Sequence, residues 1–301
     1  MILNVILIME EDYIKAGEIA AKARDYGASL IKPGASMVEV ADKIEAKIKE
    51  LGGNPAFPAQ MSINEIAAHQ MPLMEEDIIF NKGDLVCLDV GVEYDGAIGD
   101  TALTVDLGDH KNLVDASKEA LNEALKLVKP GIEIREIGKK IHEVITSYGF
   151  SPIRNLSGHG LGLYQIHTKP SIPNYDNGDK TKLEEGQVIA IEPFATTGKG
   201  VIYESGEPGI FMLSGRKPVR GKMTREVLKE IEKYNGVPFA PRWLLKKFSK
   251  IKILFALREM RILKMVQEFP SLIDESQGLV SQAEHSVIVK EKPIITTRIN
   301  N

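Results

Sequence analysis

Five residues of this sequence could together bind metal ions. They are Asp89, Asp100, His159, Glu192 and Glu284. Four carboxylates and one neutral imidazole carry a charge of −4, which two divalent cations would balance. Oxygen and imidazole ligands suit cobalt, manganese or iron(II), with zinc as a further option. The set differs from a zinc site built from thiolates. Two such ions ~3.5–4 Å apart can polarise a carbonyl group and activate water, so the set predicts hydrolytic chemistry.

The two aspartates are expected on one face of a β-hairpin. They lie in the segment 89–102, DVGVEYDGAIGDTA, where Asp95-Gly96 is a strong signal for a two-residue turn. A turn there pairs residue 89 with residue 102 and makes Asp100 the diagonal neighbour of Asp89, ~7–8 Å away. The flanking apolar residues predict burial, and two buried carboxylates repel each other unless a cation lies between them. The alternative is that Asp89 and Asp100 are two solvated acids near a turn and bind no metal.

The remaining candidates lie in glycine-rich or strongly apolar segments. His159 and His167 are eight residues apart, so on one extended strand their side chains would point the same way. Glu192 ends the apolar run VIAIE, where a carboxylate is costly to bury unless it is paired or bound to a metal. Glu284 lies in QAEHSVIV, and strand alternation places His285 on the opposite face, so we leave His285 out of the metal site.

A degenerate repeat predicts the elements that position these residues. The segments 32–55, KPGASMVEVADKIEAKIKELGGNP, and 129–152, KPGIEIREIGKKIHEVITSYGFSP, share nine residues at an offset of 97. Each contains an amphipathic helical pattern that ends at a glycine. A further helix precedes each copy, at 16–30 and 113–128, and a strand follows each. Those strands place Asp89 and Glu192 at equivalent positions, so two related halves would bring both carboxylates to a central cleft.

Length and composition favour a large globular enzyme. The chain has 301 residues, 43% hydrophobic and 27% charged, which excludes disordered, collagen-like and disulfide-stabilised small proteins. Cys87 is the single cysteine, so a reducing, cytoplasmic location is expected. No apolar run approaches the ~18 residues of a membrane helix. The first nine residues lack the basic start and cleavage site of a signal peptide, so we expect a short structural segment or an overlong start.

Positive charge is concentrated in one segment. Residues 216–265 contain 15 Lys and Arg but only 4 Asp and Glu, so they carry +11 while the rest of the chain carries −15. A solvated helical surface is the simpler interpretation. The alternative is a docking surface for a polyanion such as ribosomal RNA.

Four segments that hold these residues resemble the signatures of methionine aminopeptidases. They are LDVGVEYDGAIGDTALTV, NLSGHGLGLYQIH, AIEPFATTGKG and QAEHSVIV, and the resemblance extends from about residue 16 to residue 295. It implies an α+β pita-bread fold, in which two pseudo-symmetric halves surround a curved antiparallel sheet. The 91 residues between Glu192 and Glu284 resemble type 2 enzymes, archaeal in style because no long charged N-terminal extension is present.

The resemblance also implies a division into domains. A catalytic domain would comprise residues 1–214 and 274–301, and a helical insert would comprise residues 215–273, with helices near 224–234 and 242–248. The family has a pocket histidine that the segment YESGEPGIFML does not supply, and Phe269 stands where some relatives have a tyrosine.

The same resemblance assigns roles to individual residues. The five ligands would hold two divalent ions, and a hydroxide between the ions would attack the carbonyl group of the N-terminal methionine of a nascent protein. His69 would contact the substrate near the scissile bond, and His167 would stabilise the tetrahedral intermediate. Glu192 would carry a proton to the leaving amine. Phe57 and Ile166 would line the methionine pocket, although plain core packing explains either equally well. A small second residue should be preferred.

Three other functions are compatible with this pattern. A Xaa-Pro aminopeptidase or prolidase shares the fold and metals but usually has a large extra N-terminal domain, whereas about 15 residues precede the first expected helix here. A non-catalytic pita-bread protein that binds RNA or ribosomes would have lost metal ligands, and a creatinase-like hydrolase would lack the metal set. We expect a cytoplasmic monomer that acts on nascent N-termini and binds neither DNA nor membranes.

Overall fold

An apolar hairpin forms the centre of the first half. In the computed structural model, which describes residues 2–299, β4 (Leu85–Tyr94) and β5 (Ala97–Asp106) are antiparallel, and β1 (Asn54–Pro55) and β2 (Gln60–Ile63) pair with β4. Asp95 and Gly96 form the turn, and both have positive φ, 47° and 90°. Asp89 lies opposite Ala102 and Asp100 opposite Gly91, so the predicted turn and register are confirmed.

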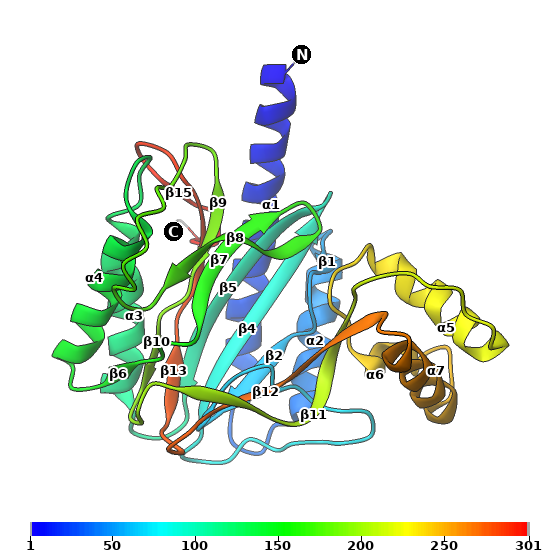
Figure 1. Cartoon of the computed structure of the whole chain (residues 1–301). Coiled ribbons are helices and arrows are strands. Elements are labelled where there is room, and N and C mark those ends of the chain that lie inside the picture. Colours follow the sequence, from blue (N-terminus) through cyan, green and yellow to red (C-terminus); the bar gives the residue numbers. More distant parts are fainter. Residues whose placement is uncertain (1, 300–301) are drawn as a thin grey trace.

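Two helices cover one face of this hairpin (Figure 1). They are α1 (Ile2–Leu30) and α2 (Met37–Glu50), and the Oγ of Ser36 accepts a hydrogen bond from the N–H of Glu39 at the start of α2. The predicted start of the first helix, residue 16, is wrong because neither proline nor glycine interrupts residues 2–16 and the helix continues through them. Within residues 2–299, none of the helices has both the length and the apolar character needed to cross a bilayer.

The second half repeats the arrangement of the first. Its helices are α3 (Lys111–Leu125) and α4 (Ile134–Ser147), and α4 begins and ends 97 residues after α2, which confirms the offset of the repeat. The central strand β9 (Val188–Ile191) pairs with β7 (Ser157–Gly162) on one side and β14 (His285–Ile288) on the other. The strands β8 (Gln165–Pro173) and β15 (Ile294–Ile295) extend this sheet, and β6 (Ser151–Pro152), β10 (Phe194–Thr196) and β13 (Val280–Gln282) form a smaller one.

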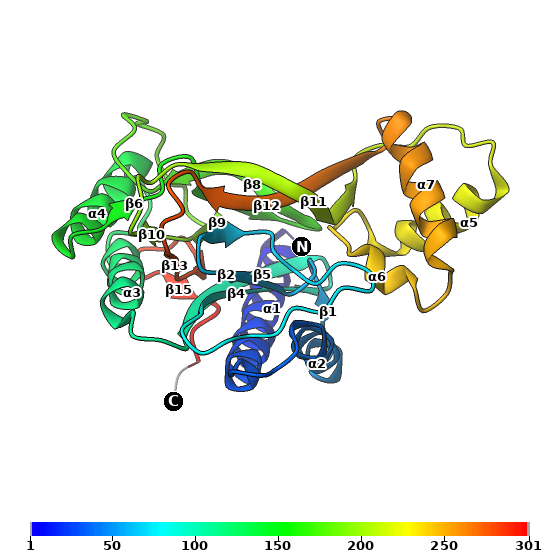
Figure 2. The ribbon, with the colours of Figure 1, turned by 90° about the horizontal axis from the view of Figure 1, so that it is seen from below.

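A long hairpin carries the chain from the second half to a helical insert. Its strands are β11 (Ile202–Leu213) and β12 (Val266–Asp274), and β12 also pairs with β3 (Ile66–Ala68). The insert, seen at the right of Figure 2, consists of α5 (Lys222–Ile231), the 3-10 turn Glu232–Tyr234, α6 (Pro241–Leu244) and α7 (Lys250–Ile262). The domain division at residues 215 and 273 remains a prediction, and residues 266–273 lie in β12, which pairs with β11 and β3.

The helices of the insert differ in part from those expected. The expected helix 224–234 corresponds to α5 and the 3-10 turn that follows it. The expected helix 242–248 is wrong in length, because α6 ends at Leu244, and α7 was not predicted. Apolar residues lie around the circumference of α7, where Ile253 is fully buried and Ile251 is 81% exposed. This pattern lacks the one-sided periodicity that identifies an amphipathic helix.

Candidate metal centre

Every residue predicted for the site lines one cavity between the two halves. The cavity has a volume of about 180 Å³. It contains the five predicted ligands, Asp89, Asp100, His159, Glu192 and Glu284, together with His69, His167, Phe57 and Ile166. The structure therefore brings together side chains that lie more than 200 residues apart in the sequence.

The candidate ligands come from five different strands or strand ends, and His159 lies on β7. Asp89 and Asp100 lie on β4 and β5, Glu192 directly follows β9, and Glu284 directly precedes β14. One ligand atom each from Asp100, His159 and Glu284 lies within 4.8 Å of the others. The Nε2 atom of His159 is 3.9 Å from Oδ2 of Asp100 and 3.7 Å from Oε1 of Glu192. This spacing leaves room for cations between the donor atoms.

Burial makes this cluster unfavourable without a cation. Desolvation raises the pKa of each of the four carboxyl groups, and the neighbouring carboxylates raise the pKa values of Asp100, Glu192 and Glu284 further. Oδ1 of Asp89 and Oδ1 of Asp100 are buried and have no hydrogen-bond partner among the described residues. Burial also lowers the pKa of His159 to about 3, so its ring is neutral and has a free lone pair. Orphaned carboxylate oxygens beside a neutral imidazole fit divalent metal ions.

His159 and His167 lie on two strands rather than one. Leu163 and Tyr164 form a two-residue turn between β7 and β8, and Tyr164 has a φ of 56°. The interpretation of one extended strand is therefore wrong, because a turn without glycine or asparagine gave no signal in the sequence. The hairpin still brings the two rings together edge to face, with centroids 4.4 Å apart. His167 is exposed, whereas His159 is buried.

His69 is held in an unusual backbone conformation at the rim of the cavity. Its φ is 66°, and its N–H donates a hydrogen bond of 2.7 Å to Oε1 of Gln60. Its Nδ1 lies 3.1 Å from the carbonyl oxygen of Pro270 and must carry a proton to donate to it. The ring meets that of Phe269 edge to face, with centroids 5.7 Å apart. Burial lowers the pKa of His69 to about 4, so the ring is neutral at physiological pH.

Several residues of the cavity were not predicted. Gln282 donates a hydrogen bond of 3.2 Å from Nε2 to Oε2 of Glu192, and its position two residues before Glu284 was a usable signal because residues i and i+2 share a strand face. Gln60 gave no signal, because its importance follows from the pairing of β2 with β4. The apolar wall is completed by Ile210, Pro238 and Leu272. Ile210 belongs to the segment 203–213, which contains no histidine.

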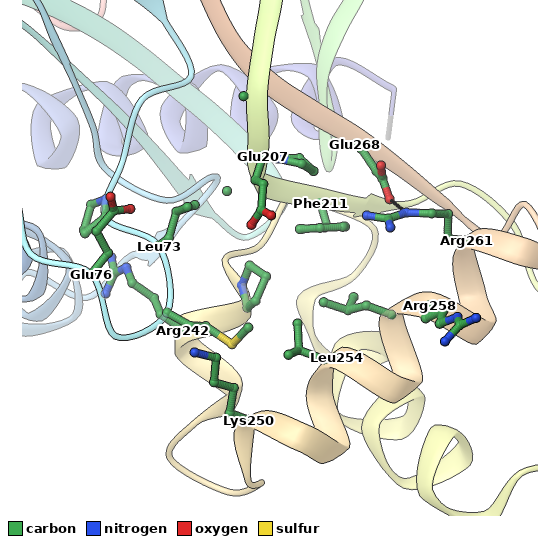
Figure 3. A pocket seen from close by; sticks show the side chains of 17 residues that line it. Leu73, Glu76, Glu207, Phe211, Arg242, Lys250, Leu254, Arg258, Arg261 and Glu268 are labelled. Atoms are coloured by element: carbon green, nitrogen blue, oxygen red, sulfur yellow. Dashed lines mark hydrogen bonds and ion pairs between the residues drawn. The ribbon is translucent and has the colours of Figure 1, made fainter.

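A second, larger cavity lies between the insert, β11 and the segment 72–76. Its volume is about 930 Å³, and it is lined by Arg242, Lys250 and Arg258 of the insert and by Leu73 and Glu207 of the catalytic domain (Figure 3). Neighbouring residues of β11 separate the two cavities: Ile210 faces the metal centre and Phe211 the second cavity. Among the described residues, the second cavity has no buried group of acids and histidines, so the smaller cavity is the candidate site.

Comparisons with known proteins agree on one family. The model of metallopeptidase family M24 matches residues 11–234. Methionine aminopeptidase of Archaeoglobus fulgidus is 49% identical over 94% of this chain and 96% of its own, and that of Thermococcus onnurineus is 47% identical over 95% and 99%. The crystal structure of methionine aminopeptidase from Thermotoga maritima matches with a TM-score of 0.69 at 26% identity, covering 96% of both chains.

Proposed function

Because this chain belongs to metallopeptidase family M24, and within it to the methionine aminopeptidases that remove N-terminal methionine, we propose that its carboxylate cavity holds two divalent metal ions. The ligands are Asp89, Asp100, His159, Glu192 and Glu284. The α+β pita-bread fold is shared with these enzymes, and metal dependence follows from the family. The number of ions rests on charge: four carboxylates that repel one another in a buried cluster are neutralised by two divalent cations.

Bound metal ions supply Lewis acidity, which polarises the scissile carbonyl group and lowers the pKa of water. The residues of the chain orient the donor atoms. Gln282 fixes one oxygen of Glu192, and the backbone carbonyl of Gly160 lies 3.3 Å from Nδ1 of His159, which directs Nε2 toward the carboxylates. Oxygen ligands with one imidazole accept cobalt, manganese or iron(II), with zinc as a further option.

Three side chains would act on the substrate. His167, which lines the cavity, can donate a hydrogen bond to the oxygen of the tetrahedral intermediate. Neutral His69 carries its proton on Nδ1 and donates it in a hydrogen bond to the carbonyl oxygen of Pro270. Its Nε2 is therefore free to accept a hydrogen bond from the substrate beside the scissile bond. Glu192 is the candidate for carrying a proton to the leaving amine, because its side chain is 14% exposed whereas that of Asp100 is 4% exposed.

The apolar end of the cavity has the character of a methionine pocket. Phe57 and Ile166 are 5% and 6% exposed and belong to one cluster. The ring of Phe57 packs directly on Gly91, where an added Cβ would lie 2.2 Å from the ring. The volume of about 180 Å³ leaves little room beyond a methionine side chain, which favours small second residues.

One assay with purified protein tests this assignment against the prolidase alternative. Turnover of Met-Ala-Ser, Met-Leu-Ser and Ala-Pro-Ser is compared with the metal content of the same sample. We expect cleavage of Met-Ala-Ser, much slower cleavage of Met-Leu-Ser and none of Ala-Pro-Ser, with two ions per chain. Cleavage of Ala-Pro-Ser at a similar rate would contradict the pocket assignment, and one ion per chain at full activity would contradict the dinuclear site.

The position of the insert supports the assignment to type 2 enzymes. Its basic surface supports docking on the ribosome. Its helices lie between β11 and β12, where the length of the chain predicts them. Several of its basic residues are already neutralised: Lys247 pairs with Glu230, Lys252 with Glu226 and Arg261 with Glu268. Lys222, Lys229 and Lys246 are exposed and form no ion pair with a described residue. We therefore centre the proposed RNA contact within residues 216–265 on these three lysines.

A further inference from the structure

One buried carboxylate of the catalytic domain takes no part in the metal centre. Glu45, on α2, is 8% exposed. Its Oε2 accepts a hydrogen bond of 2.8 Å from Nε1 of Trp243, and its Oε1 accepts one from Nη2 of Arg242. The other terminal nitrogen of Arg242, Nη1, lies 2.6 Å from Oδ1 of Asp42. Two consecutive residues of the insert therefore grip a single side chain of the catalytic domain.

This contact is not explained by stability alone. Burial raises the pKa of Glu45, and the Arg242 guanidinium and the Trp243 indole oppose that shift only in part. The Nε of Arg242 is buried without a hydrogen-bond partner among the described residues. A buried ion pair often contributes no more stability than apolar side chains of the same volume. What the pair does supply is a fixed orientation of the Glu45 carboxylate.

The Glu45 carboxylate is connected to the metal centre through the chain segment 57–60. Its Oε1 also lies 3.4 Å from the N–H of Ala59. The next residue, Gln60, accepts the hydrogen bond that holds the backbone of His69 and lies opposite Asp89 in the β2–β4 register. The same segment begins with Phe57, which lines the cavity. A shift of Ala59 would therefore move the support of His69.

A second connection runs through apolar packing. Trp243 contacts the cluster of Met71, Ile210 and Ala240, to which Phe269 also belongs. Phe269 touches the ring of His69, and Ile210 lines the cavity. The backbone and the ring of His69 are thus both supported by elements that the Arg242–Trp243 pair holds in place.

We propose that Arg242 and Trp243 of the insert are positioning residues for His69, acting through Glu45 and the segment 57–60. The inference rests on the role proposed above for His69 in substrate contact. The insert then has a second task besides any docking: it fixes a residue of the active site from outside the catalytic domain. Arg242 also borders the second cavity, beside Lys250 and across from Leu73 (Figure 3).

A double-mutant cycle tests this inference with the metal-loaded enzyme and Met-Ala-Ser. We expect Arg242→Met to lower kcat about tenfold with unchanged metal content, because small misplacements of catalytic groups are costly. In the His69→Ala background the same change should lower kcat less than about twofold, because positioning has lost its target. Arg242→Lys, which keeps the charge but not the planar fork, should fall between Arg242→Met and the wild type. Trp243→Phe removes the indole donor but keeps an aromatic ring, and serves as the probe if Arg242→Met does not fold.

Arg135→Met is the matched control. Arg135, at the start of α4, also pairs with two carboxylates, Glu133 and Glu136, but does not line the cavity. It should leave kcat unchanged. If Arg242→Met and Trp243→Phe lower kcat equally in both backgrounds, or in neither, the inference fails while the role of His69 stands. If His69→Ala alone retains full kcat, the proposed role of His69 is wrong and the positioning role falls with it.

Discussion

The rings of His159 and His167 meet edge to face across the β7–β8 hairpin, with centroids 4.4 Å apart. His159 is buried and its Nε2 faces the carboxylates, whereas His167 is exposed at the cavity. One hairpin therefore places the proposed metal ligand His159 directly beside His167, the proposed substrate contact. This contact is the structural basis for assigning the two histidines different roles.

Substitution of a central ligand should abolish activity and leave the fold intact. We expect Asp100→Asn or Glu284→Gln to lower turnover by more than about a hundredfold, since even partners outside the ligand set typically cost ~10–100-fold. Metal content should fall as well. The metal-free variants should melt no lower than the metal-free wild type, because each removes one of several mutually repelling buried charges.

Asp95→Asn is the control for these variants. Asp95 is exposed in the turn of the same hairpin, where Asn-Gly is as favourable as Asp-Gly. It should retain metal content and turnover. An Asp100→Asn enzyme with full metal content and wild-type turnover would remove Asp100 from the metal centre.

His69→Ala and His167→Ala should lower turnover with little effect on metal content. Both residues line the cavity but lie outside the ligand set, and loss of one hydrogen bond made in the transition state costs ~10²–10³ in rate. Elemental analysis and kcat are measured on the same samples. Loss of a metal ion from either variant would show that the division between ligands and substrate contacts is wrong.

The half-buried His69 should make stability depend on pH. Its pKa is about 4 in the folded protein against the ordinary 6.5, so the unfolded chain binds the extra proton and stability falls as pH drops below 6.5. When the pH is lowered from 7.5 to 5.5, the free energy of unfolding of the metal-free wild type should fall by about 1 kcal/mol more than that of metal-free His69→Ala. Urea unfolding of both proteins at the two pH values measures the difference. Equal losses would mean that the ring of His69 is not kept neutral in the folded protein.

Charge reversal of the three unpaired lysines of the insert should weaken ribosome binding. We expect wild type to co-sediment with ribosomes at low salt and to be released as salt rises, because phosphate contacts release counterions. Lys222→Glu, Lys229→Glu and Lys246→Glu in one chain should reduce co-sedimentation. The control reverses three exposed lysines of the second half, Lys118, Lys139 and Lys182, and should bind like wild type. A wild type that never co-sediments would leave the solvated surface as the correct interpretation.

The sequence predicted those parts of the site that local patterns determine. Asp95-Gly96 and strand alternation were enough to place Asp89 beside Asp100, and Asp89 and Glu192 line one cavity, as the repeat predicted. Contacts that depend on tertiary pairing were not accessible in this way. Gln60 reaches His69 only because the loop after β3 folds back on β2, and the Leu163-Tyr164 turn contains no residue that favours its positive φ. The contact of Arg242 and Trp243 with Glu45 joins residues about 200 positions apart, and no periodic pattern in the sequence can predict it.

Anomalous diffraction from crystals grown with manganese tests the dinuclear centre most directly. The account predicts two anomalous peaks inside the cavity, each within ligand distance of carboxylate oxygens from the set Asp89, Asp100, Glu192 and Glu284, with Nε2 of His159 bound to one of them. A single peak at full occupancy in an active enzyme, or peaks outside this cavity, would contradict it.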